Sequence, residues 1–176
     1  MKVKTLTPLF TAEQIERRVR ELAGEINEAY AGRQLVVICV LKGAFMFFSD
    51  LLKHVTVNPE IDFVRVASYG RSDVSSGTVS FSKDTELPLA GKDVLLVEDV
   101  VDSGITMDFL LRQMRARGTN SLRVAALVDK VERREVDVPV DFVGFSVSSG
   151  FIVGYGLDYD EHYRELPAVY TAIMED

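Results

Sequence analysis

Short apolar runs alternate with stretches of helical spacing along most of this chain. Residues 35–41 and 94–97 are continuous apolar runs, which are typical of strands in the middle of a parallel sheet that is covered on both faces. Residues 61–67 and 122–127 are predicted as two further strands. Because strands and helices alternate, we expect an α/β fold, namely a doubly wound, mainly parallel sheet flanked by helices.

The helices are predicted from apolar spacing and from the signals at their ends. Thr11 and Gln14 have the spacing of a capping box, which marks a helix start. The residues after them keep an apolar face, made of Ile15, Val19, Leu22, Ala23, Ile26 and Tyr30. Helices are also predicted over residues 45–52 and 107–117. Gly118 is typical of a residue that follows a helix C-terminus.

One long stretch shows neither pattern. Residues 70–88 are rich in Ser, Asp, Lys and Gly, and only Val79 and Phe81 hint at a brief hairpin, which is too polar to form core. Loops longer than about 15 residues are uncommon inside a compact domain. The stretch is therefore either a surface insertion or a flexible lid that closes over a reaction and excludes water.

Composition and charge narrow the class of protein. The chain has 176 residues, 47% of them hydrophobic, which suits one domain, residues 1–176, with a sizeable core. Its formal net charge of −7 argues against nucleic acid or an anionic membrane as a partner, since both need a basic face. The single cysteine, Cys39, lies in an apolar run and is expected to be a small buried hydrophobe. No apolar segment approaches the roughly 18 residues of a membrane span, so we expect a cytoplasmic protein.

Three carboxylates and a turn of small residues follow the apolar run at residues 94–97. Glu98, Asp99 and Asp102 are expected beyond the carboxyl end of this strand, where ligands of open α/β sheets gather. Residues 103–106 then offer hydroxyls and backbone N–H groups at a helix start, which favours a phosphate. Because acids repel phosphate, we expect them to face sugar hydroxyls, a divalent cation or a proton in transfer. In the ordinary alternative, the acids end the strand and the turn caps the helix.

The motif at residues 98–106, Glu-Asp-Val-Val-Asp-Ser-Gly-Ile-Thr, resembles the phosphoribosyl pyrophosphate signature of type I phosphoribosyltransferases. Further segments resemble the hypoxanthine-guanine branch of that family, in chain order 40–45, 63–69, 141–145 and 151–159 up to Arg164. The resemblance covers most of the chain.

This resemblance implies a fold, an activity and partners. The fold adds a small base-binding hood at about residues 145–176 and a lid loop at about residues 70–88. The implied activity is purine salvage, in which 5-phosphoribosyl moves from phosphoribosyl pyrophosphate to N9 of hypoxanthine or guanine and gives IMP or GMP and pyrophosphate. The implied cofactor is Mg²⁺, and the implied assembly is a homodimer or homotetramer.

The resemblance also implies roles for the acids and the turn. Glu98 and Asp99 bind the ribose hydroxyls, and Asp102 lies beside purine N7 as the catalytic acid or base. The 5′-phosphate is bound by Asp102, Ser103, Gly104, Ile105 and Thr106. Ile105 stands where some relatives carry a polar or basic residue, so only its backbone N–H can contribute there.

The resemblance also assigns residues to the pyrophosphate, the metal ion and the lid. The pyrophosphate is assigned to Lys42, Gly43 and Arg164, and the Leu41–Lys42 peptide is expected to be capable of a cis conformation. The metal is assigned to Asp158, with Glu98 and Asp99 nearby. The leading edge of the lid is assigned to Ser68 and Tyr69.

The purine base is assigned to four residues by the same resemblance. Lys130 follows a predicted strand and donates a hydrogen bond to the purine O6. This contact selects a 6-oxopurine over adenine, because an unmatched buried polar group is costly. Phe151 stacks on the purine face, and backbone carbonyls near Ile152 and Asp158 accept from the 2-amino group of guanine.

Two alternative functions stay open at this point. A xanthine-preferring phosphoribosyltransferase would keep the sugar site and change only the base pocket. A phosphoribosyltransferase-like regulator that binds RNA is the other alternative, although the acidic balance argues against it. His54, His162 and Cys39 offer no arrangement for a transition metal or a nucleophile.

Overall fold

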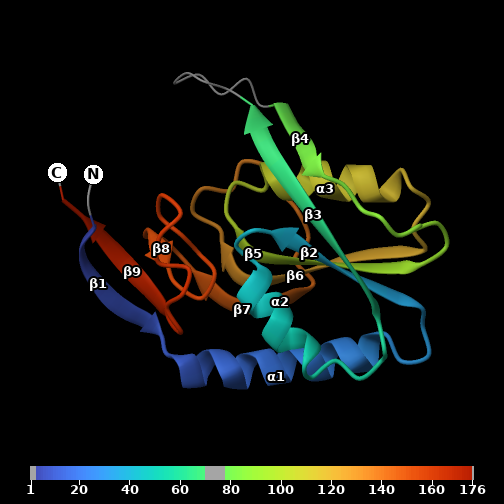
Figure 1. The fold of residues 1–176 in the computed structure, drawn as a ribbon, viewed down its shortest axis with the longest axis horizontal. Helices are drawn as coiled ribbons and strands as arrows, with labels where there is room; N and C mark the ends of the chain where they lie inside the picture. The colour runs from blue at the N-terminus through green and yellow to red at the C-terminus, as the bar shows by residue number, and fades with distance from the viewer. Residues whose placement is uncertain (1–2, 70–77, 176) are drawn as a thin grey trace.

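The computed structural model describes residues 3–69 and 78–175 and is built around one six-stranded sheet (Figure 1). The strand order is β4-β3-β2-β5-β6-β7. The strands are β2 (Leu35–Leu41), β3 (Glu60–Tyr69), β4 (Thr78–Lys83), β5 (Asp93–Val101), β6 (Ser121–Lys130) and β7 (Phe142–Val147). All neighbours pair in parallel except β3 and β4, which are antiparallel. The predicted mainly parallel sheet is confirmed.

Helices cover both faces of the sheet. Figure 1 shows α1 (Ala12–Ala29) and α2 (Phe45–Leu52) on one side and α3 (Ile105–Arg115) on the other. Successive β5 side chains divide between two core clusters, with Leu95 and Val97 in one and Val94 and Leu96 in the other. A strand that alternates between two buried faces must be apolar throughout, which is why residues 94–97 read as a continuous run.

Several predicted element boundaries were wrong, two of them at the site. The strand expected to end at Val97 continues to Val101, because it stays paired with β6 through Val101 and Asp129. The helix expected from Met107 begins at Ile105. The capping box is confirmed: Gln14 N donates to Thr11 Oγ1, and Thr11 N donates to Gln14 Oε1 at 2.8 Å.

A second, three-stranded sheet has the order β1-β9-β8. It joins β1 (Val3–Phe10) to β8 (Ile152–Val153) and β9 (Val169–Met174), and Figure 1 shows β1 and β9 side by side. The hood expected from residues 145–176 alone therefore also contains the N-terminal strand. Phe10 stacks on Phe145 with ring centroids 4.0 Å apart, which fixes this sheet against the end of β7.

The stretch expected to be a loop over residues 70–88 is partly a strand. Residues 70–77 lie outside the described residues, whereas β4 pairs with β3, so the hint of a hairpin is confirmed. Phe81 packs against the core and lies 5.3 Å from the ring of Phe109. The expectation that this hairpin is too polar to form core holds only in part, because partly buried Phe81 packs against the core beside α3.

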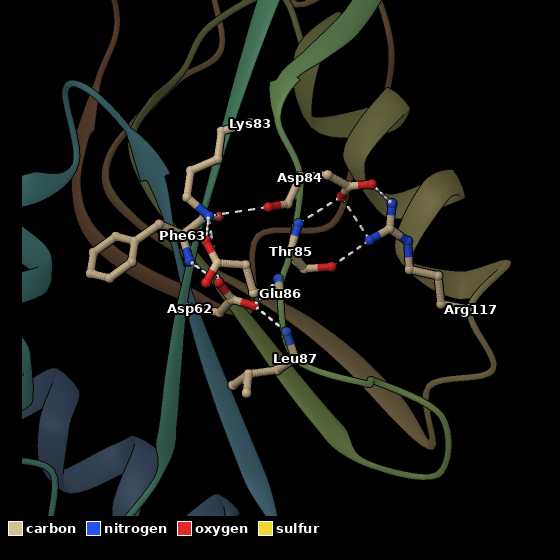
Figure 2. Close-up of polar contacts among 8 residues, drawn as sticks. All are labelled: Asp62, Phe63, Lys83, Asp84, Thr85, Glu86, Leu87 and Arg117. Atoms are coloured by element: carbon tan, nitrogen blue, oxygen red, sulfur yellow. Dashed lines mark hydrogen bonds and ion pairs between the residues drawn. The ribbon is translucent and has the colours of Figure 1, made fainter.

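The chain after β4 is held by a buried carboxylate, as Figure 2 shows. Asp62 is 4% exposed, and its Oδ2 accepts hydrogen bonds from the backbone N–H groups of Glu86 at 2.8 Å and Leu87 at 2.9 Å. Arg117, which follows α3, forms an ion pair with Asp84 at 2.7 Å. These contacts fix residues 84–87 to the sheet and to the end of α3. In the described part of the chain, no helix is long and apolar enough to cross a membrane.

Candidate active site

The carboxyl ends of three neighbouring parallel strands bring together residues that are far apart in the sequence. Lys42 and Gly43 follow β2, Glu98 and Asp99 lie in the last part of β5, and Lys130 is the last residue of β6. Since β5 pairs with both β2 and β6, these side chains share one edge of the sheet. This is the edge at which open α/β sheets bind ligands.

The turn between β5 and α3 forms a small hollow. Gly104 precedes the helix with φ of +86° and has no side chain to cap it, whereas Ser103 Oγ accepts a hydrogen bond from the N–H of Ile105 at 3.4 Å. The alternative in which Asp102 and Ser103 cap α3 is therefore supported for Ser103, while the structure shows no such bond for Asp102. The hollow has a volume of about 110 Å³ and is lined by Glu98, residues 100–104, Thr106 and Met107. It combines a helix N-terminus with two hydroxyls, as an anion site requires.

A larger hollow of about 480 Å³ lies elsewhere, between α1 and α2. Its lining includes Ile15, Val19 and Met46. It does not include Glu98, Asp99 or Asp102. The volume of a hollow alone would therefore select one that contains none of the predicted site residues.

Asp102 and Lys130 face each other across the ends of β5 and β6. Lys130 Nζ lies 3.5 Å from Asp102 Oδ2. Lys130 is only 7% exposed, so its charge is held close to a carboxylate with little access to water. Oδ1 of Asp102 is buried and accepts no hydrogen bond from the described residues. A buried carboxylate oxygen without a donor is costly, and it marks this oxygen as one that can serve a ligand.

Glu98 is buried at this edge of the sheet, and its carboxyl group has a raised pKa. Burial, followed by the negative charge of Asp99, raises the pKa of Glu98 well above its usual range. Glu98 lines the small hollow, and its Oε1 accepts from the N–H of Asp99 at 3.1 Å. Asp99 Oδ1 accepts from the N–H of Val100 at 2.8 Å. The expectation that Glu98, Asp99 and Asp102 project into a cleft beyond the strand holds only in part, because Glu98 is just 8% exposed.

Gly43 packs tightly between two other segments of the site. A Cβ at Gly43 would lie 1.7 Å from Asp99 Oδ2, and a Cβ at Gly156 would lie 2.1 Å from the carbonyl oxygen of Gly43. Only glycine fits at residue 156, where the obstacle is backbone, whereas a larger residue at position 43 would require the Asp99 carboxylate to move. The Leu41–Lys42 peptide just before it is cis, as the resemblance implies.

The two cations predicted to bind pyrophosphate lie around one acidic side chain. Lys42 Nζ is 2.8 Å from Glu161 Oε2, and Arg164 Nη2 is 3.4 Å from the same oxygen. The hydrogen bond from Lys42 holds the pKa of Glu161 below its usual range. Arg164 also pairs with Asp158 Oδ1 at 2.8 Å. Lys42 and Arg164, separated by more than 120 positions in the sequence, are thus brought together around the carboxylates of Glu161 and Asp158.

The hood contributes an exposed aromatic ring and a buried strand. Phe151 is 43% exposed and meets Tyr159 edge to face, with ring centroids 5.4 Å apart. Ile152 is 7% exposed in β8, so only its backbone is available to a ligand. Ser68 and Tyr69 are the last residues of β3, and the first part of the lid expected after them, residues 70–77, lies outside the described residues.

Comparisons with known proteins agree with this geometry. A family model, the phosphoribosyl transferase domain, matches residues 6–160. The chain belongs to the phosphoribosyltransferase family. A hypoxanthine-guanine phosphoribosyltransferase of Bacillus subtilis is 44% identical over 161 residues, which cover 92% of this chain and 89% of the relative. One from Mycobacterium avium is 46% identical over 169 residues, with 93% and 83% covered.

Solved structures show the same relationship. The crystal structure of a hypoxanthine phosphoribosyltransferase from Staphylococcus aureus matches this phosphoribosyltransferase with a TM-score of 0.91 at 38% identity. The match covers 97% of this chain and 92% of that one. The fold and the enzyme class expected from the sequence are thereby confirmed.

Some residues at the site of this phosphoribosyltransferase were not predicted. Glu161 lies inside the segment that resembles the family, and its position between Asp158 and Arg164 was the available signal. Arg134 has no such signal. Its Nε donates to the carbonyl oxygen of Asp102 at 2.9 Å from a loop that carries no recognisable motif.

The carboxylates assigned to Mg²⁺ are not gathered into one cluster. Within residues 3–69 and 78–175, no three His, Cys, Asp or Glu side chains are placed to hold a metal ion together. Mg²⁺ bound to a phosphorylated substrate takes only one or two carboxylates and keeps phosphate oxygens and water as its other ligands. Asp99 and Asp158 fit that pattern better than the buried Glu98.

Proposed function

We propose that this phosphoribosyltransferase moves 5-phosphoribosyl from phosphoribosyl pyrophosphate to N9 of hypoxanthine or guanine. The observation that carries this proposal is the pairing of Asp102 with the buried Lys130, 3.5 Å apart at the end of the central strands. It provides a proton acceptor and a hydrogen-bond donor side by side, as a 6-oxopurine with N7 and O6 requires. The names of the relatives with 44% and 46% identity support the same substrates.

In this proposal, the sugar phosphate lies along the turn after β5. Ser103, Gly104, Ile105 and Thr106 bind the 5′-phosphate with hydroxyls and backbone N–H groups at the start of α3, together with the N–H of Asp102. Glu98 and Asp99 accept hydrogen bonds from the ribose hydroxyls. A Glu98 held neutral by burial still accepts through its carbonyl oxygen, so its raised pKa is compatible with this role.

Asp102 manages the proton of the base. As N9 attacks C1 of the ribose, the bond between C1 and the pyrophosphate oxygen breaks and positive charge develops on the sugar. The N7 proton then moves to the carboxylate of Asp102, which acts as a general base. Its buried Oδ1, which accepts no bond from the described residues, is the oxygen we assign to this proton.

The leaving pyrophosphate is received by Lys42, the backbone of Gly43 and Arg164. Lys42 and Arg164 already converge on the carboxylate of Glu161, and we infer that the anionic pyrophosphate takes the place of this carboxylate. Mg²⁺ held by Asp158 or Asp99 would neutralise charge on the departing oxygens.

Base selection rests on Lys130 and the hood. Lys130 donates to O6, which adenine lacks, and Phe151 stacks on the ring. The backbone carbonyls near Ile152 and Asp158 accept from the 2-amino group of guanine. Ser68 and Tyr69 stay predictions as the leading edge of a lid. The cytoplasmic location and the homodimer or homotetramer also stay predictions, to be tested by cell fractionation and by light scattering.

The test is a turnover assay with phosphoribosyl pyrophosphate, Mg²⁺ and each of four bases, namely hypoxanthine, guanine, xanthine and adenine. We expect turnover with hypoxanthine or guanine, little with adenine, and none after chelation of Mg²⁺. Turnover mainly with xanthine would replace the proposed substrate. RNA binding that weakens with salt, without turnover of any base, would contradict the enzyme assignment.

A further inference from the structure

Arg134 reaches from the loop after β6 to the end of β5. Its Nε donates to the carbonyl oxygen of Asp102 at 2.9 Å, and its Nη2 donates to the carbonyl oxygen of Val101 at 3.2 Å. The same Nη2 forms an ion pair with Asp129, the neighbour of Lys130. The side chain of Arg134 is only 15% exposed, so this guanidinium is a fixed part of the structure and not a surface charge.

The backbone beside Arg134 holds the next carbonyl group. The N–H groups of Glu135 and Val136 both donate to the carbonyl oxygen of Ser103, at 2.9 and 3.0 Å. Three consecutive carbonyl groups, those of residues 101 to 103, therefore point toward one segment, residues 134–136. In a trans peptide the N–H and C=O bonds point in opposite directions. The N–H groups of residues 102 to 104 are thus directed away from residues 134–136.

The hollow after β5 lies on another side of the turn. It is lined by Glu98, residues 100–104, Thr106 and Met107, and by none of residues 134–136. Contact between the turn and residues 134–136 is close, since a Cβ at Gly104 would lie 2.2 Å from the carbonyl oxygen of Val136 and 3.1 Å from Cδ of Arg134. Residues 134–136 therefore back the turn on one side and leave the N–H groups of residues 102 to 104 facing away from them.

We propose that Arg134 is a positioning residue that orients the peptide groups of the turn toward the 5′-phosphate. This inference rests on the proposed phosphate site at residues 102–106. Through Asp129, Arg134 also ties the turn to the strand that carries Lys130. Donors that are already oriented bind an anion without reorganisation. Loss of Arg134 therefore weakens binding of the sugar phosphate more than binding of pyrophosphate, which uses Lys42, Gly43 and Arg164.

The test compares Arg134→Lys with Arg18→Lys. Arg18 is a matched control, because its Nε and Nη2 also donate to two consecutive carbonyl oxygens, those of Gly144 and Val143, far from the turn. A lysine keeps the charge in both variants but cannot reach two carbonyl groups from a planar fork. Binding of ribose 5-phosphate and of pyrophosphate is measured separately by calorimetry, together with kcat and the two KM values.

For Arg134→Lys we expect the Kd of ribose 5-phosphate and the KM of phosphoribosyl pyrophosphate to rise about tenfold or more, as for a lost charge-assisted hydrogen bond. The Kd of pyrophosphate should stay within about twofold of the wild-type value on the same scale. For Arg18→Lys both ligands should bind as in the wild type. If Arg134→Lys does not fold, Arg134→Gln keeps an amide donor but loses the charge that pairs with Asp129, and it should raise the same Kd at least as much.

Two results would overturn the inference. Either Arg134→Lys binds ribose 5-phosphate normally, or it loses ribose 5-phosphate and pyrophosphate equally, as a general loss of structure would cause. A third variant, Thr106→Val, separates this failure from failure of the phosphate site itself. Weaker ribose 5-phosphate binding in Thr106→Val with normal binding in Arg134→Lys rejects only the role of Arg134. Normal binding in Thr106→Val would reject the proposed phosphate site.

Discussion

Lys130 Nζ lies 3.5 Å from Asp102 Oδ2, which joins the last residue of β6 to the turn that follows β5. Only one oxygen of Asp102 is engaged in this way, since Oδ1 accepts no bond from the described residues. The pair therefore holds a carboxylate in place and leaves one oxygen available for a ligand. This arrangement gives the first prediction.

Asp102→Asn should lower kcat by about 100-fold or more, because an amide cannot accept the N7 proton and general base catalysis contributes on this scale. Binding of the nucleotide product should change by only a few-fold. Steady-state kinetics and calorimetric titration with the nucleotide measure the two effects. Asp108→Asn in α3, which removes a surface partner of Arg112, is the control and should leave kcat unchanged. A kcat near the wild-type value in Asp102→Asn would refute the proton role.

Lys130→Met keeps most of the buried volume of Lys130 but removes the donor proposed for the purine O6. We expect the KM of hypoxanthine to rise about tenfold, as for one lost hydrogen bond to a charged group, with a much smaller change in the KM of phosphoribosyl pyrophosphate. The control is Lys92→Met, which removes a lysine that is also largely buried but pairs with Glu60. An unaltered preference among the bases in Lys130→Met would argue against the O6 contact.

Glu161→Gln removes the carboxylate that lies between Lys42 and Arg164. Since a ligand anion no longer has to displace this charge, the KM of phosphoribosyl pyrophosphate should fall a few-fold. The effect should shrink at high ionic strength, because exposed charges are screened. Glu165→Gln makes the same change of net charge nearby and is the control. A KM that rises instead would mean that Glu161 helps to bind the substrate.

Gly43→Ala should reduce kcat/KM by about 10- to 100-fold, since small misplacements of catalytic groups have effects of this size. The added Cβ would lie 1.7 Å from Asp99 Oδ2, so the carboxylate or the loop must move. Gly24→Ala in α1 adds the same methyl group where nothing lies within 4 Å. This control should keep full activity and gain about 1 kcal/mol of stability. Full activity in Gly43→Ala would show that the contact with Asp99 is not required.

Cys39 should be inert to thiol reagents in the native enzyme at pH 8 and react fully in denaturant. Its side chain is fully buried, and burial raises the pKa of the thiol to about 12, with Glu98 and Asp99 adding to the rise. The unfolded thiol ionises near its ordinary value of 9.0. The unfolded chain therefore loses a proton above about pH 9 that the native enzyme keeps, so stability from this group falls as the pH rises. Thiol titration and thermal melts from pH 8 to 10 test both statements, with Cys39→Val as the control that should remove this part of the slope.

The local pattern of apolar and polar residues was sufficient to predict that the fold is a sheet covered by helices. The apolar run at residues 94–97 predicted a central strand because each face of β5 is buried under a different core cluster. The capping box at Thr11 and Gln14 predicted the start of α1, since such signals act between residues three positions apart. The acids and small residues at positions 98–106 predicted the turn between β5 and α3.

Contacts between distant segments were decided only by the tertiary structure. Nothing local in residues 3–10 indicates a strand of the hood, because β1 is stabilised by pairing with β9 at the other end of the chain. The extension of β5 to Val101 depends on β6 beside it.

For the site, too, some features follow from the sequence and others only from the tertiary structure. The sequence by itself determined which side chains are chemically able to bind a sugar phosphate and a purine, because that depends on residue type and short spacing. The tertiary structure decided that Glu98 is buried, that Glu161 lies between Lys42 and Arg164, and that Arg134 holds the turn of Asp102. Burial and pairing of charges are set by which segments pack together, and that packing is not encoded in any short stretch of the chain.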